Sequence, residues 1–247
     1  MSKKLFMILS MIFCIVFSGC SCNKEELIDA NKVLFEENNK LNNQVEIYDG
    51  VEEIFDFYNN ITTENVDSFV LVESKNVITG NTKYSNGVVV ARNGYYHYVL
   101  TDYFALTQNG VISYRVMDSK AVVYDVSLAN DYDEETGLIL LIVVTSGHSN
   151  VSMKTISLGD VDNLIGHISS INQFNKVQIY TQIKTSTIMY EDTSYNVYNL
   201  ENVNSENGSS LINSKNKLCG IYLSKINSFI GIELIKEVVY STYSLVL

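Results

Sequence analysis

The sequence contains no proline and few cysteines, histidines and basic residues. Because asparagine, isoleucine and tyrosine are abundant in the same chain, we interpret the missing proline as a compositional bias with little bearing on function. Of the four cysteines, Cys14, Cys20 and Cys22 lie near the N-terminus, and Cys219 stands alone in the rest of the chain. A lone cysteine forms no disulfide framework, so we expect Cys219 to be a small buried apolar residue, with pairing to Cys22 the less favoured alternative.

Positive charge is also scarce, since 17 Lys and Arg residues against 28 Asp and Glu residues give a net charge of -11. An acidic surface repels phosphate backbones, so we expect no nucleic-acid partner.

The three histidines, His97, His148 and His167, are dispersed and fit no common metal-ligand spacing. The acidic stretch at 125–135 lacks the glycine and the spacing of an EF-hand loop, which favours a solvated loop over a calcium site. We therefore expect neither a metal nor another cofactor.

The first residues are typical of an export signal. Two lysines precede an apolar run, residues 5–17, that is too short to cross a bilayer core of about 30 Å as a helix. The run leads into Phe-Ser-Gly before Cys20, which resembles the lipobox of bacterial lipoproteins with Phe17 in place of its usual leucine. This predicts a signal peptide over residues 1–19, membrane attachment through a lipid on Cys20, and a location on the extracytoplasmic face of the bacterial cell membrane. A plain secretory signal and an uncleaved anchor helix are the alternatives.

The segment after the anchor is predicted to be a helical spacer that ends at residue 58. Apolar side chains recur in it every seven residues, at Leu27, Leu34, Leu41 and Tyr48. A coiled-coil dimer would need a second apolar repeat, but Glu37 and Gln44 interrupt it. The pattern favours a spacer whose last part, residues 51–58, docks on the following domain. Weak self-association through residues 23–58 is the alternative.

Residues 59–247 are predicted to form an all-β domain. Short β-type runs with polar breaks begin near residue 65, and a helix from 235 to about 240 closes the chain. The pattern favours two barrels, at about 65–145 and 146–247, or a sandwich. The expected strands are 68–72, 85–92, 95–101, 113–117, 120–125, 138–144, 167–172, 176–184, 186–190, 195–200, 209–213, 218–223 and 229–234.

Three segments in order resemble the chymotrypsin-like serine proteases, most closely the bacterial HtrA-type peptidases. Residues 85–105, with S-N-G-V-V-V and then Y-V-L-T-D-Y-F-A, are similar to the family's G-S-G-V-I and Y-V-L-T-N-x-H-V. Residues 137–143 match its D-L-A-V-L-K-V strand, and residues 205–221 match G-N-S-G-G-P-L-V-N followed by Q-V-V-G-I. Residues 229–235 resemble the late F-A-I-P-I strand. The resemblance covers about residues 65–247, without a PDZ domain, and implies a double β-barrel with a C-terminal helix.

The resemblance also implies where a catalytic triad would lie. The histidine position falls on Phe104, the aspartate position on Gly137 and the serine position on Asn207. None of these residues supplies the base, the orienting carboxylate or the hydroxyl nucleophile that the mechanism requires. Ser209, two residues further on, is the alternative nucleophile. We expect His148 to be a solvated loop residue and His167 to lie on an edge strand.

Three functions follow from these observations. The first is a membrane-anchored pseudoprotease that binds a peptide or protein, which makes the chain a serine protease homologue without enzymatic activity. The second is an active serine endopeptidase with a rearranged site that uses Ser209. The third is a structural or assembly lipoprotein that acts through its helical spacer.

Overall fold

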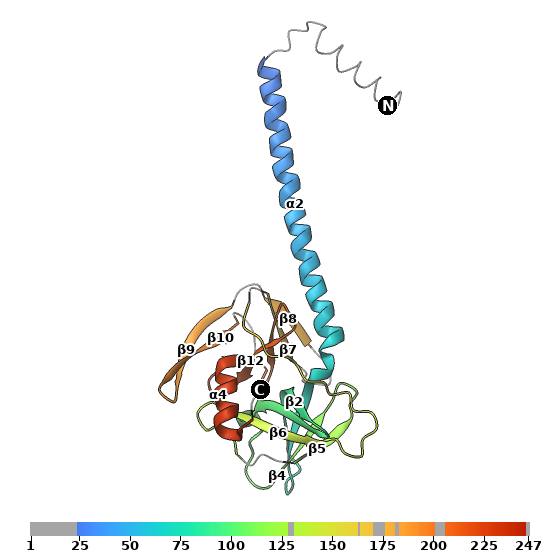
Figure 1. Cartoon of the computed structure of the whole chain (residues 1–247), viewed down its shortest axis with the longest axis vertical. Helices are drawn as coiled ribbons and strands as arrows, with labels where there is room; N and C mark the ends of the chain where they lie inside the picture. Colours follow the sequence, from blue (N-terminus) through green and yellow to red (C-terminus); the bar gives the residue numbers. More distant parts are fainter. Residues whose placement is uncertain are drawn as a thin grey trace. The chain divides into compact units, whose positions relative to one another are not determined.

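A computed structural model describes residues 24–127, 131–162, 164–169, 176–180, 183–200 and 206–245 (Figure 1). The predicted signal peptide and Cys20 lie outside the described residues. Contacts divide the chain into two units, Met1–Glu52 and Glu53–Leu247.

Helix α2 (Lys24–Glu64) begins close to the predicted start of the spacer and continues six residues past its predicted end at 58. In the first unit, every side chain of residues 31–42 is exposed, including the apolar Val33, Leu34, Phe35 and Leu41. None of the helices in the described part of the chain combines the length and the apolar character needed to cross a membrane.

The last turns of α2 belong to the second unit, which therefore starts before the predicted boundary at residue 59. Phe57 and Ile61 are buried in its core, and a Cβ atom added to Gly166 would lie 2.6 Å from the Ile61 Cδ1 atom. Val51 and Phe55 stay exposed. Docking was predicted for residues 51–58, and the contact is made through Phe57 and the later Ile61.

Six antiparallel strands form a closed barrel in the order β1-β2-β3-β6-β5-β4. The barrel interior is lined by aliphatic side chains with the ring of Tyr124 among them. Two short helices accompany these strands. The 3-10 helix η1 (Val66–Ser68) comes before β1, and α3 (Tyr103–Leu106) lies between β3 and β4. The strands are β1 (Phe69–Asn76), β2 (Thr82–Asn93), β3 (Tyr96–Asp102), β4 (Ile112–Met117), β5 (Val123–Ser127) and β6 (Leu138–Val144).

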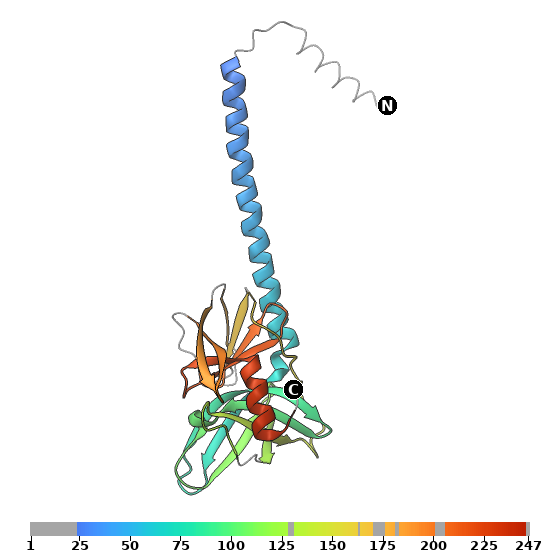
Figure 2. The same ribbon diagram turned by 60° about the vertical axis from the view of Figure 1, so that its left-hand side comes forward.

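A second sheet of seven strands has the order β8-β7-β11-β12-β13-β10-β9. Its two outer strands, β8 and β9, follow one another in the sequence, and no pairing between them is seen in the described ranges. Helix α4 (Ile232–Tyr243) closes the fold (Figure 2). The strands are β7 (Ile165–Ser169), β8 (Lys176–Tyr180), β9 (Lys184–Tyr190), β10 (Thr193–Asn199), β11 (Ser210–Asn213), β12 (Leu218–Leu223) and β13 (Ser228–Gly231).

The barrel and the second sheet share one core. Val88, Leu100 and Leu140 face away from the barrel interior and cluster with Ile221 and Ile230 of the second sheet. Their strand neighbours Val89, Val99 and Leu141 line the barrel instead. Strands with apolar residues on both faces read as continuous apolar runs, which is the pattern of residues 138–144. The prediction of a mostly β fold with a C-terminal helix is confirmed.

The junction between β13 and α4 differs from the prediction, which extended the strand to 234. The strand ends at Gly231, and the helix begins at Ile232, three residues earlier than expected. Ile232, Ile235 and Val239 are all buried, as the three-to-four residue spacing of one helix face requires. The apolar run therefore forms a helix from Ile232 onward, despite its β propensity, because its apolar residues recur with the helical spacing.

Candidate functional site

The Phe104 region is organised by Asp102, which the sequence analysis did not single out. Its Oδ1 atom accepts hydrogen bonds from the backbone N–H groups of Phe104 (3.0 Å) and Ala105 (3.5 Å), so Asp102 caps the N-terminus of α3. Its Oδ2 atom accepts from the backbone N–H of Ser224 at 2.8 Å. Burial raises the pKa of Asp102, and these hydrogen bonds oppose that rise. The carboxyl group thus links the end of β3 to the segment after β12. An aspartate directly before a short helical run was the available sequence signal.

Two of the three triad-equivalent positions meet. Gly137 has φ +85°, and a Cβ atom added to it would lie 2.5 Å from the Phe104 Cδ2 atom. The Tyr103 N–H donates to the Gly137 carbonyl oxygen at 2.9 Å. The Phe104 ring therefore occupies the space that any side chain at residue 137 would need.

An aromatic cluster surrounds the Phe104 ring. Tyr103 and Tyr132 stack with their centroids 3.6 Å apart, and each presents an edge contact to Phe104, at 5.5 and 5.8 Å. The Lys225 Nζ atom lies 5.3 Å from the Phe104 centroid and donates to the Glu134 carbonyl oxygen. A cation near a ring face is attracted by it. These contacts are structural, and neither Phe104 nor Gly137 can exchange a proton.

Asn207 is held against β2. Its carbonyl oxygen accepts hydrogen bonds from the Asn86 N–H and Asn86 Nδ2, both at 2.9 Å, and from the Ser85 Oγ atom at 3.1 Å. A Cβ atom added to the next residue, Gly208 (φ +71°), would lie 2.0 Å from the Asn86 carbonyl oxygen. Only glycine fits this close approach. The loop at residue 207 is therefore fixed by its backbone to β2 of the barrel.

Ser209 and His167 form a buried pair that the sequence analysis did not foresee. The Ser209 Oγ atom lies 2.7 Å from the His167 Nε2 atom, and both residues are almost fully buried. The ring of Phe229 makes an edge contact with the imidazole at 5.3 Å. Strand β7 lies between β8 and β11, so the prediction of an edge-strand position for His167 is wrong. The pairing depends on the β7–β11 register across 42 residues, for which the sequence carries no local signal.

The environment of His167 disfavours its charged form. Burial lowers its pKa to about 4, the charge of Lys176 adds to this effect, and the Gln178 side chain opposes it. The Nδ1 atom has no hydrogen-bond partner among the described residues. A triad needs a carboxylate at this nitrogen to orient and stabilise the imidazolium.

The other two histidines lie elsewhere. His148 is exposed in a loop, as predicted, with its ring 4.7 Å from that of Tyr124. His97 is fully buried on β3, and burial and the charge of Arg92 lower its pKa. Across the described ranges, His, Cys, Asp and Glu side chains form no group of three or more suited to a metal ion.

No protein-family model matches the chain, and no curated protein sequence does so either. The geometry of the candidate site is therefore the basis for a functional proposal. That geometry holds Phe104 against Gly137, fixes Asn207 through its backbone, and buries the pair of Ser209 and His167.

Proposed function

We propose that this protein is a binding protein of chymotrypsin-like, HtrA-type architecture that has lost its catalytic triad and captures a peptide or another protein. The contact between Phe104 and Gly137 carries this proposal. In a working triad these two positions would hold the base and its orienting carboxylate within hydrogen-bond distance. Here they hold a phenyl ring and the glycine that makes room for it.

The arrangement of elements supports the same proposal. Phe104 lies on the short helix after β3, and Gly137 lies directly before β6, which pairs with β3. The resemblance to the protease family implies this placement for the histidine and aspartate positions. A closed six-stranded barrel, a second sheet and a C-terminal helix agree with it.

An active endopeptidase that uses Ser209 is the second candidate, and the hydrogen bond between Ser209 and His167 favours it. Three observations oppose it. Ser209 is fully buried, His167 lacks a carboxylate partner among the described residues, and a pKa of about 4 makes its imidazole a weak base. A nucleophile must reach its substrate, so we prefer the binding protein.

A serine-directed fluorophosphonate probe tests both candidates on the purified full-length protein, with active trypsin as the positive control. We expect no labelling and no cleavage of fluorescent casein. Labelling that disappears in Ser209→Ala but persists in Ser210→Ala, a substitution at the neighbouring buried serine, would show that Ser209 is a nucleophile and overturn the proposal.

Assembly through the helix is a third candidate, favoured by the exposed apolar residues Leu34 and Leu41. Sedimentation equilibrium of the full-length protein in density-matched detergent tests it. Leu41→Glu places a charge on the apolar stripe, whereas Asn39→Glu places the same charge on another face. If self-association exists, only Leu41→Glu abolishes it. A monomeric wild-type protein excludes self-assembly through the helix.

A further inference from the structure

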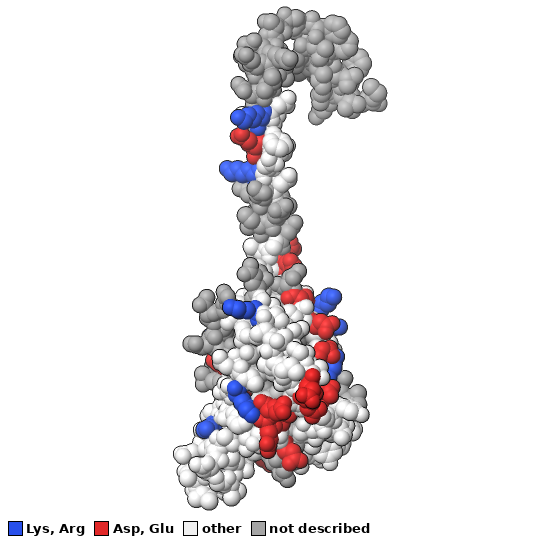
Figure 3. Space-filling model, turned by 90° about the vertical axis from the view of Figure 1, so that its left-hand side faces the viewer, with Lys and Arg blue, Asp and Glu red and all other residues white. Residues whose placement is uncertain are grey.

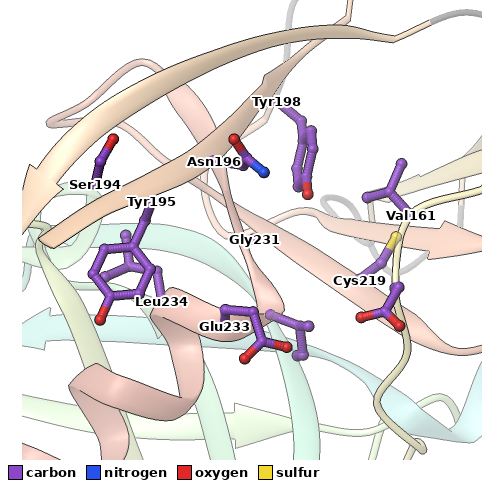
Figure 4. A pocket seen from close by; sticks show the side chains of 11 residues that line it. Val161, Ser194, Tyr195, Asn196, Tyr198, Cys219, Gly231, Glu233 and Leu234 are labelled. Atoms are coloured by element: carbon purple, nitrogen blue, oxygen red, sulfur yellow. The ribbon is translucent and has the colours of Figure 1, made fainter.

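A concave site lies in the part of the second sheet that adjoins α4. It is a pocket of about 380 Å³ at the junction of β10, the end of β13 and the first turn of α4 (Figure 4). This volume is within the range of small-ligand sites, roughly 300–1,000 Å³. None of the triad-equivalent positions lines it. The pocket is therefore distinct from the region built around Phe104.

Tyrosines and polar groups form one side of the pocket. Figure 4 shows Asn196 and Tyr198 extending from β10, while Glu233 stands at the start of α4 on the other side of the space. A Cβ atom added to Gly231 would lie 3.0 Å from the Tyr198 Cε2 atom, so the absence of a side chain at 231 lets the Tyr198 ring lie here. Apolar side chains complete the lining, among them Val161, Ile232 and Leu234.

The charged groups of the lining all have the same sign. Asp160 and Glu233 contribute carboxylates, and none of the eleven lining residues is a lysine, arginine or histidine. Burial is the main cause of the raised pKa of Tyr198, and the negative charges of Asp160 and Glu233 add to it. Asp160 also helps to raise the pKa of the buried Cys219 thiol in the same pocket, where desolvation is the larger cause. The carboxylates of Asp160 and Glu233 therefore give the pocket a negative potential. Acidic side chains also gather on the face of the strand-containing unit shown in Figure 3.

Two nearby features oppose a cationic ligand, and both are weaker than the carboxylates. The N-terminus of α4 carries about half a positive charge, against two full negative charges on Asp160 and Glu233. Lys236 pairs with Glu233 at 3.5 Å, but both side chains are exposed, and such pairs hold their partners weakly. A ligand cation can therefore replace the Lys236 ammonium.

We infer that this pocket binds a basic side chain, an ammonium or guanidinium group on an aliphatic stem. The stem packs on the apolar lining, and the cation meets the two carboxylates and the faces or hydroxyl groups of Tyr195 and Tyr198. This inference rests on the proposed binding function, since it names the kind of residue that a bound peptide or protein would present.

Isothermal titration calorimetry of the full-length protein with N-acetylarginine amide tests the inference. N-acetylcitrulline amide has nearly the same shape without the charge, and N-acetylglutamate amide reverses the charge. We expect the arginine probe to bind about tenfold more tightly than the citrulline probe at low salt, and the difference to shrink as salt rises. Equal affinities, tighter binding of the glutamate probe at the helix N-terminus, or no binding of any probe at about 10 mM would each overturn the inference.

Matched variants locate the binding. Glu233→Gln is expected to lower the affinity for the arginine probe about fivefold, and Asp160→Asn is expected to have a similar effect. Glu237→Gln removes the same charge from an exposed position on the same helix outside the lining, and should change the affinity by less than about twofold. An equal effect of Glu233→Gln and Glu237→Gln would reject the site. Labelling of Ser209 by a fluorophosphonate together with normal arginine binding would reject the proposed function and leave the pocket intact.

Discussion

Single residues determine the chemistry of the triad-equivalent region. Gly137 adopts a backbone conformation that side chains rarely take, and the Phe104 ring fills the space above it. Aspartate at 137 would therefore require movement of the ring as well as a strained backbone. A side chain at residue 137 is therefore not accommodated by a single substitution, because the phenyl ring and the glycine depend on each other.

The dependence between Gly137 and Phe104 is measurable by urea unfolding. Gly137→Ala should destabilise the protein by roughly 2–4 kcal/mol, the sum of a left-handed alanine and an overpacked ring. Gly94→Ala is the matched control, since Gly94 has φ +60° and no atom within 4 Å of an added Cβ. Gly94→Ala should lower the free energy of unfolding by only about 1 kcal/mol. In a Phe104→Ala background, the cost of Gly137→Ala should fall to that of the control. An unchanged cost would mean that the ring does not lie over Gly137.

The buried His167 predicts a pH dependence of stability. The folded protein holds the pKa of His167 at about 4, below the ordinary value of 6.5, so the unfolded chain binds more protons between these two values. The contribution of His167 to the free energy of unfolding should therefore be fully present above pH 6.5. It should be lost as the pH drops toward 4, which lowers the free energy of unfolding by about 3 kcal/mol.

Thermal unfolding between pH 4 and 7.5 checks this expectation. His167→Gln should flatten the pH dependence, whereas His148→Gln, at an exposed loop position, should leave it unchanged. Burial also lowers the pKa of His97, which acts in the same direction, so the difference between wild type and His167→Gln is the quantity to compare. Parallel curves for these two proteins would contradict the prediction.

At the scale of elements, one end of α2 is part of the globular core. Phe57 is 3% exposed and Phe55, two residues earlier on the same helix, is 62% exposed. Residues two apart lie on different faces of a helix. The same substitution at both sites changes helix propensity equally, so a difference between the two effects on stability reports the packing of Phe57. The packing of the helix end depends on Phe57 and Ile61 together with the space at Gly166.

Phe57→Ala should lower the free energy of unfolding by roughly 3–5 kcal/mol, because it leaves a cavity in the shared core. Phe55→Ala should change it by less than about 0.5 kcal/mol. Urea unfolding followed by tyrosine fluorescence measures both. Similar effects of the two substitutions would mean that the helix end does not dock through Phe57.

At the scale of the whole molecule, the predicted attachment to the membrane depends on the N-terminal segment, which lies outside the described residues. The predicted lipid on Cys20 would tether the proposed binding domain to the membrane. Two or more acyl chains on one residue would hold it stably, since a single chain gives only marginal binding.

Metabolic labelling with radioactive palmitate tests the attachment in the producing cell. The wild-type protein should incorporate label and sediment with membranes, and Cys20→Ala should abolish both properties. Cys22→Ala is the matched control, because it removes a neighbouring thiol and should leave both unchanged. Labelling that survives Cys20→Ala would refute the lipobox assignment.

The sequence by itself determined the β character of the domain and the bounds of β6 and β12. These features are local, since side-chain alternation and residue identity can be read over a few positions. Only the tertiary structure decided which buried groups meet. Ser209 joins His167, Asp102 reaches Ser224, and Phe57 rather than Phe55 enters the core. Such contacts depend on strand register and packing across long stretches of chain, which periodicity does not encode.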